Sequence, residues 1–295
     1  MDKIQVFCFL ASYSVAFVLE LYRFRGKNQV SRLIALAFSL AGLVAHTLYL
    51  LARSRQLHLP PLLSSPHDWL LVLSWLAVIS YITLTLCDRD LPIGVFLLPI
   101  VLACIGASYF VQTQISKPQL DALRGWKMLH ASLLVLGMLG VIVGLVLSLM
   151  YLFQQNRLKH RRLLTPGMAM PNLERLARLN RAAILISVPL LTFGFATGIG
   201  LILFLRGERE ASYWTDPLVL GSAVMWVVMV ALFTRLLTTN RGQGRQVALL
   251  TLWSCGFLLV TLLGLQIVSG RVGSKTWHAG DPSDLPLSHF VVSRR

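Results

Sequence analysis

Two histidines inside apolar stretches are the residues of this sequence best placed to bind a ligand. His130 lies about one turn inside the apolar stretch 126–153, and His46 lies thirteen residues into the stretch 33–52. An ionisable side chain in a membrane-spanning segment is a candidate functional residue, because lipid solvates it poorly. A neutral imidazole donates one hydrogen bond and keeps a lone pair for a metal. For each histidine alone, a hydrogen bond to a neighbouring helix is the alternative.

Both histidines are predicted to face other helices. At 100° per residue, each shares a helix face with small residues, which let a second helix approach closely inside a membrane. The small residues are Gly137, Gly144 and Ser148 beside His130, and Ser39 and Gly42 beside His46.

The composition is that of a polytopic membrane protein. Of 295 residues, 56% are hydrophobic and 13% charged, and the mean hydropathy is +0.69, which is outside the range of soluble domains. The formal net charge is +15. The basic residues lie mainly in short loops between apolar stretches, so membrane orientation explains them and nucleic acid is rejected as a partner.

Hydropathy and turn signals predict an all-α bundle of eight transmembrane helices in one membrane domain, residues 1–295, with an outer polar tail over 269–295. The first apolar stretch has no signal-peptide cleavage site and is expected to remain as a helix. The predicted helices are roughly 4–22, 33–52, 69–87, 91–111, 128–153, 182–205, 217–237 and 247–268.

The basic loops predict the orientation. Fifteen Lys and Arg residues fall on the side of the first, third, fifth and seventh loops and twelve on the other side, a margin that widens when the tail is discounted. Basic loops favour the cytoplasm, so both termini are predicted to be non-cytoplasmic. On this topology His46 and His130 both lie in the outer half of the membrane.

The remaining histidines lie outside the apolar stretches. His58 and His67 are predicted to be solvated in an outer loop, and His160 belongs to a basic inner run. His278 and His289 lie in the outer tail, from which either could reach over the mouth of the bundle.

Two loops carry further candidates. Residues 171–181 predict a short amphipathic helix on the inner membrane surface, whose basic residues Arg175, Arg178 and Arg181 form a candidate partner surface. The outer loop 206–216 ends in Tyr213-Trp214-Thr215-Asp216 before Pro217. That ending fits an aromatic belt followed by a helix cap, or an aromatic platform with a carboxylate beside the outer histidines.

The four cysteines form neither a CxxC pair nor a CxxCH sequence. A disulfide framework and a covalently attached c-type haem are therefore not indicated.

Several motifs, in a fixed order, resemble the cytochrome c assembly family of CcsA-, ResC- and HemX-like membrane proteins. The resemblance extends from Trp126 to Gly270 and, more loosely, over the first four predicted helices. The motifs are residues 171–201, Tyr213-Trp214-Thr215-Asp216-Pro217, residues 226–235 and Arg241-Gly242-Gln243-Gly244-Arg245.

The resemblance implies a haem site at the outer face. CcsA-type members present haem on a tryptophan-rich loop flanked by ligating histidines, and only the end of that loop is matched here, which makes the chain look closer to the HemX-like branch. The implied haem is b-type, non-covalent and transiently held. Its candidate axial ligands are His130, His46, His289 and His278, and its candidate face and propionate contacts are Trp126, Tyr213, Trp214, Asp216, Arg206 and Arg209.

The implied function is a haem-binding factor of cytochrome c biogenesis that holds or presents haem for attachment to apocytochrome c. The expected partners are the bilayer, haem, apocytochrome c and a second membrane assembly subunit, in a bacterial inner membrane. No catalytic residue is identified, and membership of a haem lyase stays open because the loop is truncated. The alternatives are a HemX-like regulator of tetrapyrrole synthesis, acting through the basic segment, and a small-molecule transporter, which the Pro and Gly residues of 182–205 support only mildly.

Overall fold

The computed structural model describes residues 2–25, 29–88, 91–111, 123–159, 172–204 and 217–238, and short helical pieces at 248–249, 251–253 and 256. Every regular element within these residues is a helix. The helices are α1 (Asp2–Arg25), α2 (Gln29–Leu57), α3 (Pro61–Ser64), α4 (Pro66–Cys87), α5 (Ile93–Ser108), α6 (Arg124–Lys159), α7 (Leu173–Phe204) and α9 (Pro217–Thr238).

Five of the described helices, α1, α2, α4, α6 and α7, are long and apolar enough to cross a membrane. α5 is apolar but shorter. Only fragments of the predicted eighth helix, 247–268, lie among the described residues. The all-helical membrane fold is therefore confirmed, whereas the count of eight helices and the orientation of the termini stay predictions.

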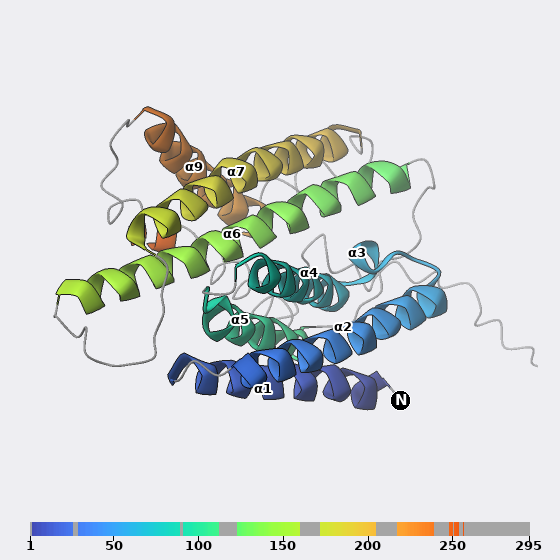
Figure 1. Ribbon diagram of the computed structural model, residues 1–295. Helices are drawn as coiled ribbons and strands as arrows, with labels where there is room; N and C mark the ends of the chain where they lie inside the picture. Colours follow the sequence, from blue (N-terminus) through green and yellow to red (C-terminus); the bar gives the residue numbers. More distant parts are fainter. Residues whose placement is uncertain are drawn as a thin grey trace, which may run out of the picture.

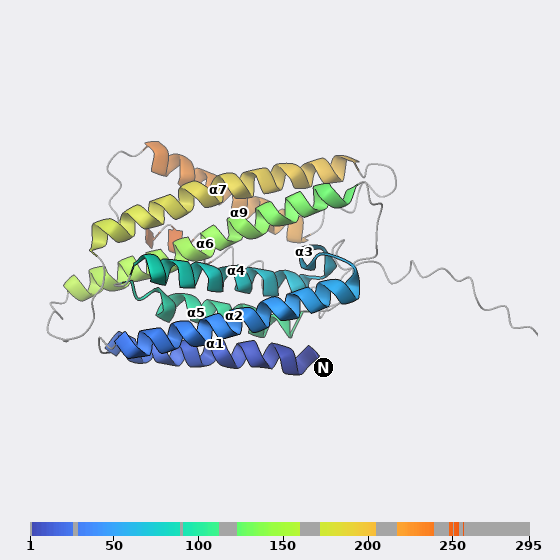
Figure 2. The ribbon, with the colours of Figure 1, turned by 45° about the vertical axis from the view of Figure 1, so that its right-hand side comes forward.

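The helices α1, α2, α4, α5, α6 and α7 lie side by side and alternate in direction along the chain, as Figure 1 and Figure 2 show. The end formed by the last turn of α2, by α3 and by the first turn of α6 is called the histidine end here. The opposite end, with the first turn of α2 and the last turns of α4 and α6, is called the basic end. Arg124, which begins α6, donates to the carbonyl oxygen of His58, just after α2, at 3.4 Å.

Glycines bring α6 and α7 into close contact. A Cβ added at Gly137 would lie 2.7 Å from Cγ of Leu191, and one at Gly140 would lie 2.7 Å from Cβ of Ser187. Such distances leave no room for a side chain. The predicted small-residue face of α6 is confirmed as the face that packs on α7, and it holds the first residues of α6 against the last turns of α7.

The first helix pair packs in the same way. A Cβ at Gly42 of α2 would lie 2.6 Å from Cε1 of Tyr13 on α1, and Ser39 is fully buried. The predicted small-residue face beside His46 is confirmed as buried.

The amphipathic segment predicted as a separate helix is part of α7, which runs without interruption from Leu173 to Phe204. The prediction of a separate surface helix over residues 171–181 is wrong. No proline or glycine interrupts residues 172–188, so the helical hydrogen bonds continue from the polar segment into the apolar one. Asn180, in the polar part, is buried.

Candidate functional site

His130 is held by the backbone of α7. Its Nδ1 atom lies 2.8 Å from the carbonyl oxygen of Gly194 and 3.3 Å from Oγ1 of Thr197. A carbonyl oxygen only accepts hydrogen bonds, so Nδ1 carries the hydrogen and donates. In the neutral ring the lone pair is then on Nε2, the atom that can ligate a metal.

A glycine face on α7 accommodates two rings from α6. A Cβ at Gly198 would lie 2.8 Å from Cε1 of His130, and one at Gly200 would lie 3.1 Å from Cζ2 of Trp126. The indole Nε1 of Trp126 donates to the carbonyl oxygen of Thr197 at 2.8 Å. Trp126 and His130 are one turn apart, and Trp126 remains 39% exposed. The result is an imidazole and an accessible indole fixed side by side at the histidine end.

His46 occupies a different environment. Its ring is fully buried and stacks on Phe9, with the centroids 4.2 Å apart and the planes 3° from parallel. The hydroxyl of Tyr13 lies 3.4 Å from Nδ1. Nε2 is buried and has no hydrogen-bond partner in the described part of the chain. His46 is thus enclosed by aromatic side chains of α1.

The two histidines belong to separate helix pairs. His130 contacts α7, whereas His46 contacts α1. Within the described residues, no hydrogen bond or ring contact connects them. They are two distinct imidazole environments.

The predictions for the outer loop were half right. His58 is exposed and has a left-handed backbone with φ of 52°. His67 is 9% exposed, and its Nδ1 lies 2.8 Å from the carbonyl oxygen of Ser108. The solvated position predicted for His67 is wrong, because α4 begins at Pro66 and its first turn packs against the end of α5.

Seven of the proposed site residues lie outside the described residues. They are the tail histidines His278 and His289, and the loop residues Arg206, Arg209, Tyr213, Trp214 and Asp216.

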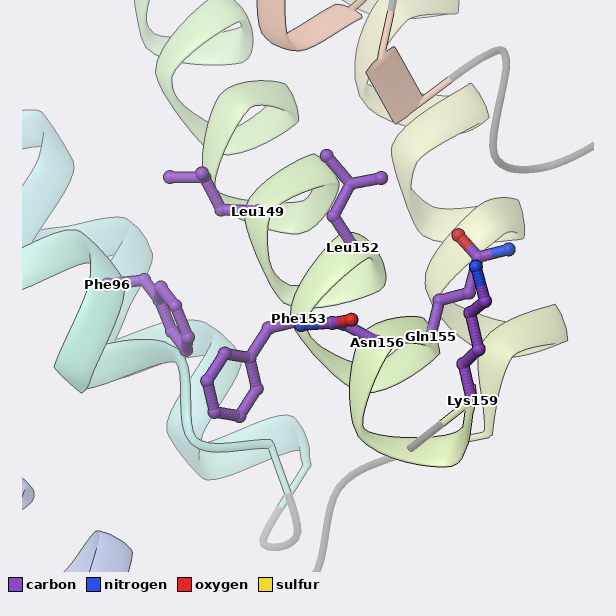
Figure 3. A pocket seen from close by; sticks show the side chains of 7 residues that line it. All are labelled: Phe96, Leu149, Leu152, Phe153, Gln155, Asn156 and Lys159. Carbon is purple, nitrogen blue, oxygen red and sulfur yellow. The ribbon is translucent and has the colours of Figure 1, made fainter. Parts of the chain in front are cut away.

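A groove of about 500 Å³ opens at the basic end, far along α6 from His130. Figure 3 shows Phe96 of α5 facing Phe153 of α6, with Lys159 at the polar end. The ring centroids of Phe96 and Phe153 are 6.3 Å apart. The groove is remote from both histidine environments, so it is not part of the candidate site.

Comparison with known proteins found a family model and a relative that match this chain. A family model described as "Cytochrome C assembly protein" matches residues 63–271, more than half of the chain. The chain belongs to the cytochrome c assembly protein family. It is also 26% identical over 286 residues to the cytochrome c biogenesis protein CcsA of Parasynechococcus marenigrum (strain WH8102), covering 84% of this chain and 88% of that protein. No solved structure matches it significantly.

In this family member, the arginines of the predicted partner surface differ in their surroundings. Arg175 pairs with Asp88, at the end of α4, at 3.0 Å. Arg178 pairs with Glu174 at 2.9 Å on the exposed surface of α7, and Arg181 is exposed. Arg175 thus links α7 to α4, while the other two face outward at the basic end.

Two buried acidic residues were not identified as important from the sequence. Asp68 is fully buried and pairs with Arg53 of α2. It also accepts hydrogen bonds from Ser64 and Ser65. The sequence Ser65-Pro66-His67-Asp68 is a capping box with proline at the first helical position, a signal that could have located this helix start.

The second acid is Glu20, which is 1% exposed. It accepts hydrogen bonds from Tyr81 at 2.8 Å and from Arg23 at 3.0 Å. The spacing of Glu20 and Arg23 indicates their ion pair, whereas the contact with α4 could not be read from local sequence.

Proposed function

We propose that this protein holds haem at the histidine end and presents it for attachment to apocytochrome c on the non-cytoplasmic side of the membrane. The observation that carries the proposal is the hydrogen bond from Nδ1 of His130 to Gly194. It leaves Nε2 as the ligating nitrogen, at the head of a membrane helix and beside a partly exposed indole. Membership of the cytochrome c assembly family supports haem as the cargo.

The donor set fits a non-covalent, b-type haem. Bound haem iron accepts one or two neutral imidazoles as axial ligands. A hydrogen bond from the other ring nitrogen to a carbonyl oxygen, such as that of Gly194, orients a ligating imidazole and raises its basicity. Trp126 can cover part of a porphyrin face. The absence of a CxxCH sequence supports the proposal that covalent attachment takes place on apocytochrome c.

The second axial ligand is proposed to come from the tail, from His289 or alternatively His278. A ligand on a tail can leave the iron, which suits a protein that must release its cargo. His46 is the third candidate and is disfavoured by its burial, because a porphyrin beside a fully buried ring requires α1 and α2 to separate. The other proposed contacts are Tyr213, Trp214 and Asp216 for the face, and Arg206 and Arg209 for the propionates.

The proposed setting is a bacterial inner membrane with both termini outside the cytoplasm. The proposed partners are apocytochrome c and a second membrane assembly subunit. Arg178 and Arg181, exposed on α7, are candidates for contact with a partner at the basic end.

Haem titration of the purified full-length protein tests the proposal. Wild type is expected to give the Soret band of low-spin haem, and His130→Ala is expected to lose it and to regain it when free imidazole is added. His58→Ala is the matched control, because His58 is an exposed histidine at the same end of the bundle. A wild-type spectrum identical to that of free haem in the same detergent would eliminate haem from the proposal.

A second function, membrane regulation of tetrapyrrole synthesis, is favoured by the exposed arginines at the start of α7. Deletion of the gene separates the two functions. Loss of c-type cytochromes with normal haem precursors supports haem presentation, whereas altered precursors with intact cytochromes support regulation.

A further inference from the structure

Arg32, in the first turn of α2, is half-buried, and its hydrogen-bond partner among the described residues is neutral. Its Nη2 atom donates to the carbonyl oxygen of Thr85, near the end of α4, at 2.6 Å. Its Nε atom is buried and has no hydrogen-bond partner in the described residues. No carboxylate among those residues lies within ion-pair distance of Arg32. A partly buried cation without a described anionic partner favours binding of an anion.

A second unpartnered group lies beside it. Thr85 is 1% exposed, and its hydroxyl oxygen has no hydrogen-bond partner in the described residues. Nη2 of Arg32 donates to the carbonyl oxygen of Thr85. Nε of Arg32 and the hydroxyl of Thr85 are each only a few bonds away from the atoms of that hydrogen bond. Two hydrogen-bond donors without acceptors therefore share one buried patch between α2 and α4.

The acidic side chains described near the ends of α1 and α4, Glu20 and Asp88, are paired with other cations. Glu20 accepts hydrogen bonds from Arg23 and Tyr81, and Asp88 pairs with Arg175. The first turn of α2 contains no acidic residue, and helix N-termini favour anions. The charges around the patch thus leave Arg32 as a net positive centre.

We propose that Arg32 and Thr85 form a binding site for a phosphate group at the basic end of the bundle. The planar guanidinium binds phosphate oxygens through directed hydrogen bonds, and the threonine hydroxyl donates one more. The phosphate belongs either to the headgroup of an anionic phospholipid or to free inorganic phosphate. The site lies at the opposite end of the bundle from His130 and is independent of the proposed haem function.

Thermal unfolding of the full-length protein in detergent distinguishes the sources. Micelles of a maltoside detergent, which contains no phosphate, are compared with the same micelles that also contain phosphatidylglycerol, and each is measured with and without inorganic phosphate in the buffer. A rise in Tm with phosphatidylglycerol alone identifies the lipid headgroup as the source. A rise with inorganic phosphate identifies a free anion, and no rise with either overturns the proposal.

Variants of Arg32 and Thr85 test whether these two residues are responsible for anion binding. Arg32→Gln removes the charge and leaves a shorter amide in place of the guanidinium, and it is expected to weaken anion binding about tenfold or more. Thr85→Val removes only the hydroxyl and is expected to weaken binding several-fold. Arg178→Gln is the matched control, because Arg178 is an exposed arginine at the same end. If Arg32→Gln does not fold, Thr85→Val still decides: wild-type anion binding in Thr85→Val, or an equal loss in Arg178→Gln, overturns the site.

Discussion

The two intramembrane histidines show that the same sequence signal can lead to opposite environments. Both lie in apolar helices beside small residues, and both face other helices. His130 packs on glycines and a backbone carbonyl of α7, so Nδ1 is held as a hydrogen-bond donor. His46 packs on aromatic rings of α1, which enclose it completely. The identity of the opposing residues, rather than the histidine's own helix, decides which atoms surround the ring.

The largest effect on the difference between the two histidine environments is expected from replacing Gly198, the glycine that packs against the His130 ring. In Gly198→Ala, the new Cβ would lie 2.8 Å from Cε1 of the imidazole, so either the ring or the helix must shift. We expect haem affinity to fall at least about tenfold, because a shifted ring breaks the hydrogen bond that orients Nε2, and stability to fall by about 1–3 kcal/mol from overpacking. Haem titration and thermal unfolding measure the two effects.

Gly106→Ala is the control for this substitution. Gly106 lies in α5, and a Cβ there would meet no atom within 4 Å. This variant should bind haem as wild type does. Wild-type affinity in Gly198→Ala as well would show that the position of the His130 ring is not critical for haem.

A smaller effect, on stability alone, is expected at His46. His46→Leu removes the buried Nε2 that has no described partner, which recovers about 1–3 kcal/mol of desolvation cost. It also loses the stacking on Phe9, worth about 0.5–1.5 kcal/mol. Unfolding should therefore show stability unchanged or raised by about 1 kcal/mol, with an unaltered Soret band. A lost Soret band would make His46 the second axial ligand.

The helices and their packed faces could be predicted from the sequence, because a membrane helix must satisfy its own backbone and because side-chain positions follow the 100° rotation per residue. These rules predicted that the helix faces containing Gly137 and Gly42 pack against other helices. The same rules could not identify which atom His130 would meet, since Gly194 is 64 residues away in the chain.

The wrong predictions arose where a polar segment of the sequence was expected to lie on the surface of the protein as a separate loop or helix. His67 follows a proline in a loop-like segment, yet it is buried against the end of α5. Residues 173–181 are rich in charge, yet they continue directly into the apolar part of α7. In both cases a distant element contacts the segment, since Ser108 accepts a hydrogen bond from His67 and Asp88 pairs with Arg175. Such tertiary contacts leave no local pattern.

Of these substitutions, Thr197→Val is expected to have the smallest effect on the environment of His130 and on haem affinity. Oγ1 of Thr197 lies 3.3 Å from Nδ1 of His130, while the Gly194 carbonyl lies closer, at 2.8 Å. Valine has nearly the same shape, so the ring and its main hydrogen bond should persist, and haem affinity should change by no more than about threefold, the equivalent of a weak hydrogen bond. Thr192→Val is the control, because the Thr192 hydroxyl bonds Trp226 and does not contact His130. A tenfold loss in Thr197→Val, with wild-type binding in Thr192→Val, would mean that the hydroxyl rather than the carbonyl orients the imidazole.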